Sequence, residues 1–460
     1  MPPPTPRKRA DPREKNEAMA VVKSLRRKTL DGFWFVPATV ACAYAALAFL
    51  LVRVDRHAGD GGVEIGFEGD ADAARNLLST IAGSLITVAG LAFSLTIVVL
   101  SLVSSQFSPR ASPSLLSDRV NQIVAGSFVG IFAYCLIVLR TVRSDQAGVT
   151  GFVPALSVTV SIALALGALA LLLLFIHHMG QSIQASRVVA RIGHATLRAI
   201  DRLHPRPFDA TARRRDKPRP RDDEPLQCFA PRAGYVLEVR TDDLAKLAGR
   251  SNLRVEVVVR PGDFVTEATQ LLAASPRGAC DQEMLEALGG TIDIASERNL
   301  EKDAAYGVRQ LADVALKALS PGIHDPTTAE ASIGYLRAAL ERLAERELED
   351  DIRADDAGTT LVVARSQSFE EYAREAFLEI GRYATDNARV VLLVLDALAA
   401  VAVVARGAAA DERASVLGDL ARAVAAPALR AAATGLDRDL LDRGLERALA
   451  ATQGVAPATR

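Results

Sequence analysis

Long apolar runs dominate the first 180 residues of the chain, and four of them contain no Asp, Glu, Lys or Arg. They cover residues 33–52, 81–103, 123–139 and 152–176. A helix needs about 20 apolar residues to cross the roughly 30 Å hydrocarbon core of a bilayer. The pattern therefore predicts a domain of four transmembrane helices over residues 33–178, with the lipid bilayer as its first partner. Because no charge lies inside the four runs, they offer no carboxylate relay for a proton pump.

The charges around the first apolar run predict its orientation. Residues 1–32 form a basic leader with nine Lys or Arg, whereas residues 53–72 contain six Asp or Glu. By the positive-inside rule, the leader is cytoplasmic. Four crossings then place both termini in the cytoplasm of a bacterial cell, with the protein in the plasma (inner) membrane. The leader lacks a small-residue cleavage site, so we interpret the first run as a retained anchor and not as a signal peptide.

The pattern changes after the fourth run, and the chain becomes polar and helical. Apolar residues at helical spacing continue to about residue 200, which predicts that the fourth span extends as a stalk and ends near His204-Pro205, because the residue before proline avoids the helical conformation. An Arg- and Pro-rich stretch follows without periodicity. We assign residues 179–227 to a helical stalk and a basic linker. A lipid or nucleic-acid contact is the alternative role for the linker.

The remaining sequence predicts an α+β cytoplasmic half. Apolar and polar residues alternate over 234–239 and 253–257, which is typical of strands and predicts a small sandwich-like β domain over 228–275. Alanine-rich helical spacing covers 276–453, with one strand at 359–366, and residues 454–460 form a disordered tail. The apolar run at 390–404 contains Asp396 and is short, so we predict a buried core helix there.

Composition excludes several classes of function. The formal net charge of −1 argues against a nucleic-acid partner, because such proteins concentrate excess positive charge. The four cysteines show neither metal-ligand spacing nor the density of a disulfide framework. Phosphate-binding, dinucleotide-binding and kinase motifs are absent from the sequence. We therefore predict no metal and no cofactor.

The second apolar run contains a stripe of small and hydroxyl residues. They recur at steps that keep them on one helix face, and they are Ser79, Gly83, Thr87, Gly90, Ser94, Ser101 and Ser105. Such a face either packs closely against another helix or lines a polar path. The run closes with Gln106, Phe107, Ser108, Pro109 and Arg110, where proline ends the helix and arginine anchors it at the headgroups.

The most distinctive stretch of the second half contains Ser320, Pro321, Gly322, His324, Asp325, Pro326 and Thr327. Ser-Pro-Gly ends one helix, Asp325 can cap the next, and Pro326 suits its first position. Capping explains most of this motif. A ligand or acid–base role for His324 and Asp325 is the alternative, although no second His and no nucleophile motif accompanies them. Just upstream, Arg298, Glu301 and Asp303 are interpreted as a solvated charged face, with an ion-pair network to Arg309 as the alternative.

These features together resemble a bacterial family of predicted membrane proteins of unknown function. The resemblance rests on four spans, the Gln106–Arg110 closure, the Gly234-Tyr235-Val236 segment and the turn around Asp325, and it covers about residues 25–400. The family pattern has Asn where this chain has His324, and a Gly near Ala268 is absent, which argues against a strict amide-dependent role. The resemblance implies a topology and no activity.

Three functions stay open at this stage. The leading hypothesis is a homo-oligomeric channel or permeation protein for an ion or small solute, with the cytoplasmic half as assembly or gating domain. The second is a membrane-anchored sensor or scaffold without transport. A membrane-tethered enzyme is third. The polar stripe favours the first hypothesis, and the absence of charge within the spans favours the second.

Overall fold

The computed structural model describes residues 35–59, 67–106, 118–144, 151–182, 184–208, 225–348, 350–354 and 360–454. The chain folds into two compact units that divide at the junction of Gln184 and Ala185. Each unit has its own helices, and only the second contains the strands that the structure names. The description below therefore takes the units one at a time.

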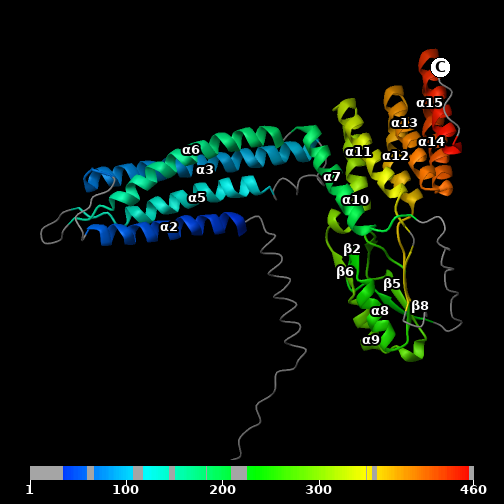
Figure 1. The fold of residues 1–460 in the computed structure, drawn as a ribbon, viewed down its shortest axis with the longest axis horizontal. Helices are drawn as coiled ribbons and strands as arrows, with labels where there is room; N and C mark the ends of the chain where they lie inside the picture. The colour runs from blue at the N-terminus through cyan, green and yellow to red at the C-terminus, as the bar shows by residue number, and fades with distance from the viewer. Residues whose placement is uncertain are drawn as a thin grey trace, which may run out of the picture. The chain divides into compact units, whose positions relative to one another are not determined.

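The first unit contains four long helices, one for each predicted span, with their axes roughly aligned (Figure 1). They are α2 (Phe35–Gly59), α3 (Ala71–Gln106), α5 (Arg119–Leu139) and α6 (Ala155–Ser182). All four are long and apolar enough to cross a membrane. Helix α2 packs along α5, and both contact α6. Glycine permits this packing, because a Cβ atom at Gly126 would lie 2.7 Å from the Cα of Pro37.

A fifth helix, α13 (Ala388–Gly407), also meets the length and apolarity of a span. It lies in the second unit, where it packs against α11, α14 and α15. Its buried face is continuous from Val390 to Ala405, while Asp396 lies 3.3 Å from the guanidinium of Arg447 on α15. The helix therefore has the packing and the charge pair of a core helix.

The stalk prediction is wrong in one respect. Helix α6 ends at Ser182, and a separate helix, α7 (Ala185–Leu203), follows. It ends directly before His204-Pro205, as predicted. Helix α7 is strongly amphipathic, and Val188, Val189 and Ile192 are buried where it packs on α10 and α11. It is therefore an integral helix of the second unit, and not a free extension of the span. The linker after residue 208 lies outside the described residues.

The β part of the second unit contains two sheets. The strands are β1 (Leu226–Phe229), β2 (Gly234–Val239), β3 (Arg254–Val257), β4 (Phe264–Val265), β5 (Gln270–Ser275), β6 (Ile292–Ala295), β7 (Asp351–Ala354) and β8 (Thr360–Ala364). One sheet has the order β1-β5-β3-β8-β7 and the other β4-β2-β6. Among the pairs of described strands, β3–β8 is the parallel one, with Val255 opposite Val362.

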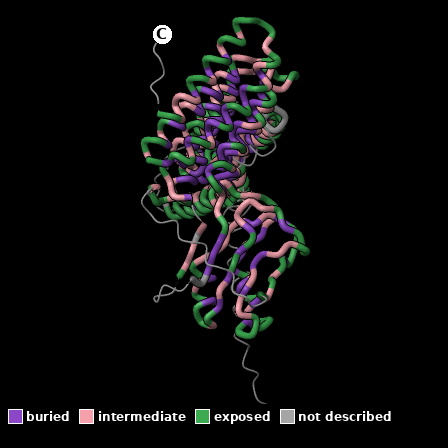
Figure 2. The backbone as a smooth tube through the Cα atoms, turned by 90° about the vertical axis from the view of Figure 1, so that its right-hand side faces the viewer, coloured by how far each residue is buried: buried purple, intermediate pink, exposed green. Residues whose placement is uncertain are grey.

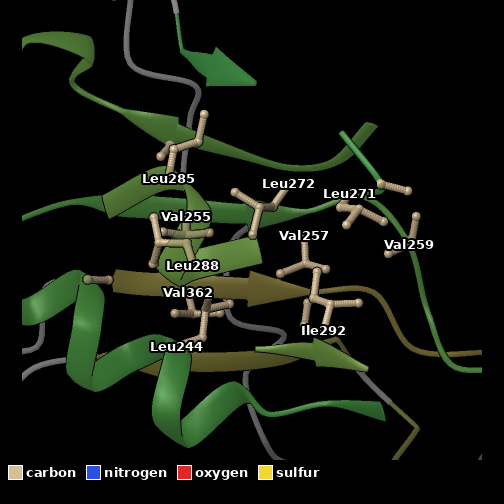
Figure 3. Close-up of a cluster of buried hydrophobic side chains, with 14 of the residues drawn as sticks. Leu244, Val255, Val257, Val259, Leu271, Leu272, Leu285, Leu288, Ile292 and Val362 are labelled. Atoms are coloured by element: carbon tan, nitrogen blue, oxygen red, sulfur yellow. The ribbon is translucent and has the colours of Figure 1, made fainter. Parts of the chain in front are cut away.

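One core joins both sheets to two short helices, α8 (Thr241–Arg250) and α9 (Gln282–Gly289). Leu244 of α8 and Leu288 of α9 pack with Val255, Leu272 and Val362 of the larger sheet (Figure 3). The predicted sandwich-like domain therefore has helices in its core. Its predicted end at residue 275 is not a boundary, because β6, β7 and β8 come from the following segment. Pairings across about 100 residues leave no local signal in sequence.

The other part of the second unit is a layer of helices. Besides α7 and α13 it contains α10 (Ala304–Ala318), α11 (Pro326–Ala344), α12 (Phe369–Tyr383), α14 (Asp411–Ala431) and α15 (Gly435–Gln453), and short 3₁₀ turns lie at Arg277–Ala279 and Leu300–Lys302. Buried and exposed stretches alternate along these helices (Figure 2), as expected for amphipathic helices that share a core.

Candidate functional site

The small and hydroxyl residues of α3 point away from the rest of their own unit. Ser79, Gly83, Thr87, Gly90, Ser94 and Ser101 are all exposed. We call these six residues the outer face of α3. A Cβ atom built at Gly83 or Gly90 would meet nothing within 4 Å. The predicted stripe is therefore present, and none of the described helices of the same chain covers Gly83 or Gly90. The side chain of Ser105 lies outside the described residues.

The opposite side of α3 is the one that packs within the chain. Ala74, Leu78, Ala82 and Leu85 are buried, and their spacing places them across the helix from the outer face. Even so, none of the described helices lies close to the backbone of α3 over as long a stretch as α5 lies close to α2. Large apolar residues such as Ile86, Leu91 and Ile97 are exposed beside the outer face. The small-residue side of α3 is thus exposed within its own unit.

A buried carboxylate of α2 and a tyrosine hydroxyl of α5 both bind the start of α6. Asp55 of α2 is 9% exposed and accepts hydrogen bonds from the backbone N–H groups of Leu156 and Ser157, each at 3.0 Å. These N–H groups belong to the first turn of α6, where a helix has free donors and favours negative charge. The hydroxyl of Tyr134 on α5 donates to the carbonyl of Ser157 at 2.8 Å. The sequence placed Asp55 in a loop beyond the first span, so this connection was missed.

Polar contacts also anchor the ends of α3 and α5. Arg75 of α3 donates to the hydroxyl of Ser144 at 2.6 Å and to the carbonyl of Val142 at 3.2 Å. Asp118 caps α5 by accepting from the N–H of Val120, and its other oxygen lies 2.8 Å from Nε2 of His178 on α6. The described spans are therefore fixed by polar groups near their ends, which leaves their middle segments apolar.

The predicted closure of the second span falls largely outside the described residues. Gln106 is the last residue of α3, and its side chain is outside the described part. Phe107, Ser108, Pro109 and Arg110 also lie outside it. The roles assigned to these residues from the sequence stay predictions.

The turn between α10 and α11 has the capping geometry that the sequence predicted. Asp325 accepts from the N–H of Thr328 at 3.1 Å and from its hydroxyl at 2.5 Å, and Pro326 is the first helical residue. His324 is exposed and has φ of +50°, a left-handed conformation that Asn and His adopt more readily than most residues. Ser320, Pro321, Gly322 and Thr327 complete the turn without approaching any grouping of metal ligands, since the described residues contain none. Backbone geometry therefore accounts for this motif.

A second polar cluster lies where the helical layer meets the sheets, and the sequence did not predict its contact between Arg260 and Glu371. Arg260, which follows β3, donates to both carboxylate oxygens of Glu371 on α12, each at 2.8 Å. Arg298 contacts Asp303 at 2.7 Å, and Asp303, only 5% exposed, caps α10. The interpretation of Arg298 and Asp303 as a solvated face is therefore wrong.

The same cluster explains a glycine in the β part. Gly262 has φ of +95°, and a Cβ atom there would lie 2.7 Å from Oδ2 of Asp303. Arg309, the other proposed member of the network, instead contacts Asp313, Glu375 and Glu379. Charge-assisted Arg–carboxylate hydrogen bonds are stronger than neutral ones, so the pair of Arg260 and Glu371 ties the β part to the helical layer.

His204 lies at the edge of this cluster. Its Nε2 is 3.4 Å from the hydroxyl of Tyr372, whose own pKa is raised by burial. Burial, and then the charges of Arg346 and Arg413, lower the pKa of His204 to about 4. The imidazole is therefore neutral at physiological pH. A neutral histidine against a buried tyrosine has the arrangement of a structural contact.

Four long apolar helices joined to a mixed α/β unit define the class: a multi-pass α-helical membrane protein. The chain belongs to the family described as "Predicted membrane protein (DUF2254)", whose model matches residues 31–400. This confirms the family resemblance inferred from the sequence.

Relatives of the chain occur in mycobacteria. It is 35% identical over 340 residues to the uncharacterized protein Rv1290c of Mycobacterium tuberculosis, and equally to the uncharacterized protein Mb1321c of Mycobacterium bovis. In both cases the match covers 73% of this chain and 65% of the relative, so the relatives are longer than the matched part. No solved structure matches the chain.

Proposed function

We propose that this protein is a homo-oligomer of the bacterial plasma membrane, in which the outer face of α3 meets the same face of other copies and lines a path for ions or small solutes. The observation that carries the proposal is the direction of this face. Its six small residues are exposed in the single chain, and the buried residues of α3 lie on the opposite side. Small residues allow close backbone approach between helices in lipid, where packing holds helices together.

Hydroxyl groups on the same face support a polar path. A path through the membrane needs polar groups that replace part of the hydration shell of an ion, and neutral oxygens can do so. Ser79, Thr87, Ser94 and Ser101 place four hydroxyls along one face of α3. The described apolar run of α3 contains no charged side chain, so the path would not depend on an intramembrane ion pair. The second unit would then act as the cytoplasmic assembly or gating domain.

Thiol accessibility tests the path. Thr87→Cys and Ser94→Cys are made separately in full-length protein that carries Cys42→Ala and Cys135→Ala. Membranes are treated with a small, charged thiol reagent, which reacts only where water reaches the sulfur and a thiolate can form. We expect both positions to react. Leu85→Cys, buried within the chain, and Leu169→Cys, exposed on α6, are the matched controls and should resist the reagent. Resistance of Thr87→Cys and Ser94→Cys equal to that of the controls would contradict the path.

A membrane-anchored sensor or scaffold is the second candidate. One observation favours it: the hydroxyl of Thr87 donates to the carbonyl of Gly83 in its own helix at 3.0 Å, so it is satisfied without water. On this account the outer face of α3 packs against protein and stays dry. Protection of Thr87→Cys and Ser94→Cys from the reagent, together with cross-linking between copies, would favour the scaffold.

A further inference from the structure

Side-chain contacts between the helices of the second unit show which helix ends lie at the same level as the start of α7. Between α7 and α11, His194 contacts Tyr335 and Asp201 contacts Arg342, and both pairs are 141 residues apart. The same offset places Ala185, the first residue of α7, level with Pro326, the first residue of α11. These two helices therefore run in the same direction and start at the same end.

Helix α10 runs in the opposite direction and confirms this end. Gly307 lies against Thr196, and the guanidinium of Arg202 donates to the carbonyl of Glu301. In each pair the two residue numbers add to 503, and a constant sum is what antiparallel neighbours give. Ala185 is therefore level with Ala318, the last residue of α10. The turn that contains Ser320 to Asp325 therefore lies beside the start of α7. We call this the proximal end of the helical layer.

The other helices extend the proximal end. Arg389, at the start of α13, pairs with Glu330 near the start of α11, at 2.9 Å. Helix α12 ends at Tyr383, four residues before the cap of α13. In α15, Gly444 lies against Leu392 of α13, and Arg447 pairs with Asp396, so these two helices also run in the same direction. Leu436, in the first turn of α15, is accordingly at the proximal end.

Large apolar side chains are exposed at this end. Ile323 is 38% exposed, Tyr383 66% and Leu436 65%, and they come from three separate connections between helices. Lys317 and Arg382 are exposed close to them. Tyrosine, isolated aliphatic side chains and long cationic side chains suit the headgroup region of a bilayer. Asp386 is exposed at the same end, so the surface is mixed in charge and is not a purely cationic patch.

The length of the chain restricts where this end can lie. Helix α6 ends at Ser182 and α7 begins at Ala185, and three residues span at most about 10 Å. The apolar run of α6 ends at Ile176, so Ser182 is about 9 Å further along the helix. The start of α7 is therefore held within reach of the membrane surface by the covalent chain alone.

We propose that the proximal end of the helical layer rests on the lipid headgroups of the membrane that the spans cross, with Ile323, Tyr383 and Leu436 as its contact residues. This places the turn around His324, whose backbone geometry is explained by capping, at the lipid surface. Ile323 directly precedes His324 in this turn, and its side chain is exposed.

Tryptophan quenching by lipid tests this contact. The chain has a single tryptophan, Trp34, directly before α2. In full-length protein with Trp34→Phe, the variants Tyr383→Trp and Leu436→Trp are reconstituted in vesicles of phosphatidylglycerol and phosphatidylethanolamine, with or without a lipid that carries a nitroxide on its headgroup. Val403→Trp is the matched control, because Val403 is 61% exposed and lies toward the other end of α13.

We expect the nitroxide lipid to quench the tryptophan of the Tyr383→Trp and Leu436→Trp variants, and to leave that of the Val403→Trp variant unchanged. Absence of quenching in both test variants would overturn the proposal. Equal quenching in the test and control variants would also overturn it, because the contact would then not be specific to the proximal end.

Discussion

The turn at His324 shows how a single backbone angle limits what a residue can do. A φ of +50° is accessible to Asn and His but costly for β-branched residues. We predict that Asp325→Ala lowers the free energy of unfolding by about 1 kcal/mol through loss of the helix cap, and that His324→Asn leaves it unchanged. Thermal unfolding of the purified protein measures both. An unchanged midpoint in the Asp325→Ala variant would contradict the capping role.

His204 gives a second prediction at this scale, on the dependence of stability on pH. Its folded pKa of about 4 is below the ordinary value of about 6.5. Between these values the unfolded chain binds a proton that the folded chain does not, so stability is full above about pH 6.5 and falls as the pH decreases toward 4. The loss for this one group is about 3 kcal/mol at most. His204→Gln should flatten this part of the stability profile, and an identical slope in both proteins would contradict the assignment.

At the scale of elements, removal of the buried carboxylate of Asp55 should lower the stability of the packed helices more than loss of any other single contact described above. Asp55→Ala leaves two N–H groups of α6 without their acceptor, which costs about 1–3 kcal/mol when such groups are buried. Asp55→Asn keeps one side-chain oxygen and should lose less. The midpoint of thermal unfolding in detergent ranks the two variants, and equal midpoints for Asp55→Ala and the native protein would show that the contact is dispensable.

Elements also differ in how far the sequence predicts them. The four long apolar helices of the first unit and the cap at Asp325 were predictable, because apolar length and capping residues are local signals. The break between α6 and α7 was not, since apolar Ile183 lies at the break and Val188 and Ile192 continue the helical pattern after it. Neither the pairing of β3 with β8 nor the contact of Arg260 with Glu371 was predictable, because each joins residues more than 100 positions apart. The sequence could not predict that the outer face of α3 is exposed, because this depends on which side of the helix packs within the chain.

At the scale of the whole molecule, the basic leader and an even number of crossings predict one orientation. A reporter that works in the cytoplasm should be active when it is fused after Arg460. A reporter that works only in the periplasm should be silent at the same position. The reverse pattern would contradict the four-span topology, because an odd number of crossings would separate the two termini. Helix α13 is the one further helix among the described residues that could add such a crossing.

The central claim is that the outer face of α3 meets another copy of the chain, and disulfide cross-linking in native membranes tests it most directly. Ser94→Cys, in protein that also carries Cys42→Ala, is oxidised and examined for a dimer on a denaturing gel without reductant. Leu169→Cys, exposed on α6, is the control. The account predicts a cross-linked dimer for Ser94→Cys and none for Leu169→Cys. A monomer in both variants, with the thiol of the Ser94→Cys variant still free, would contradict it.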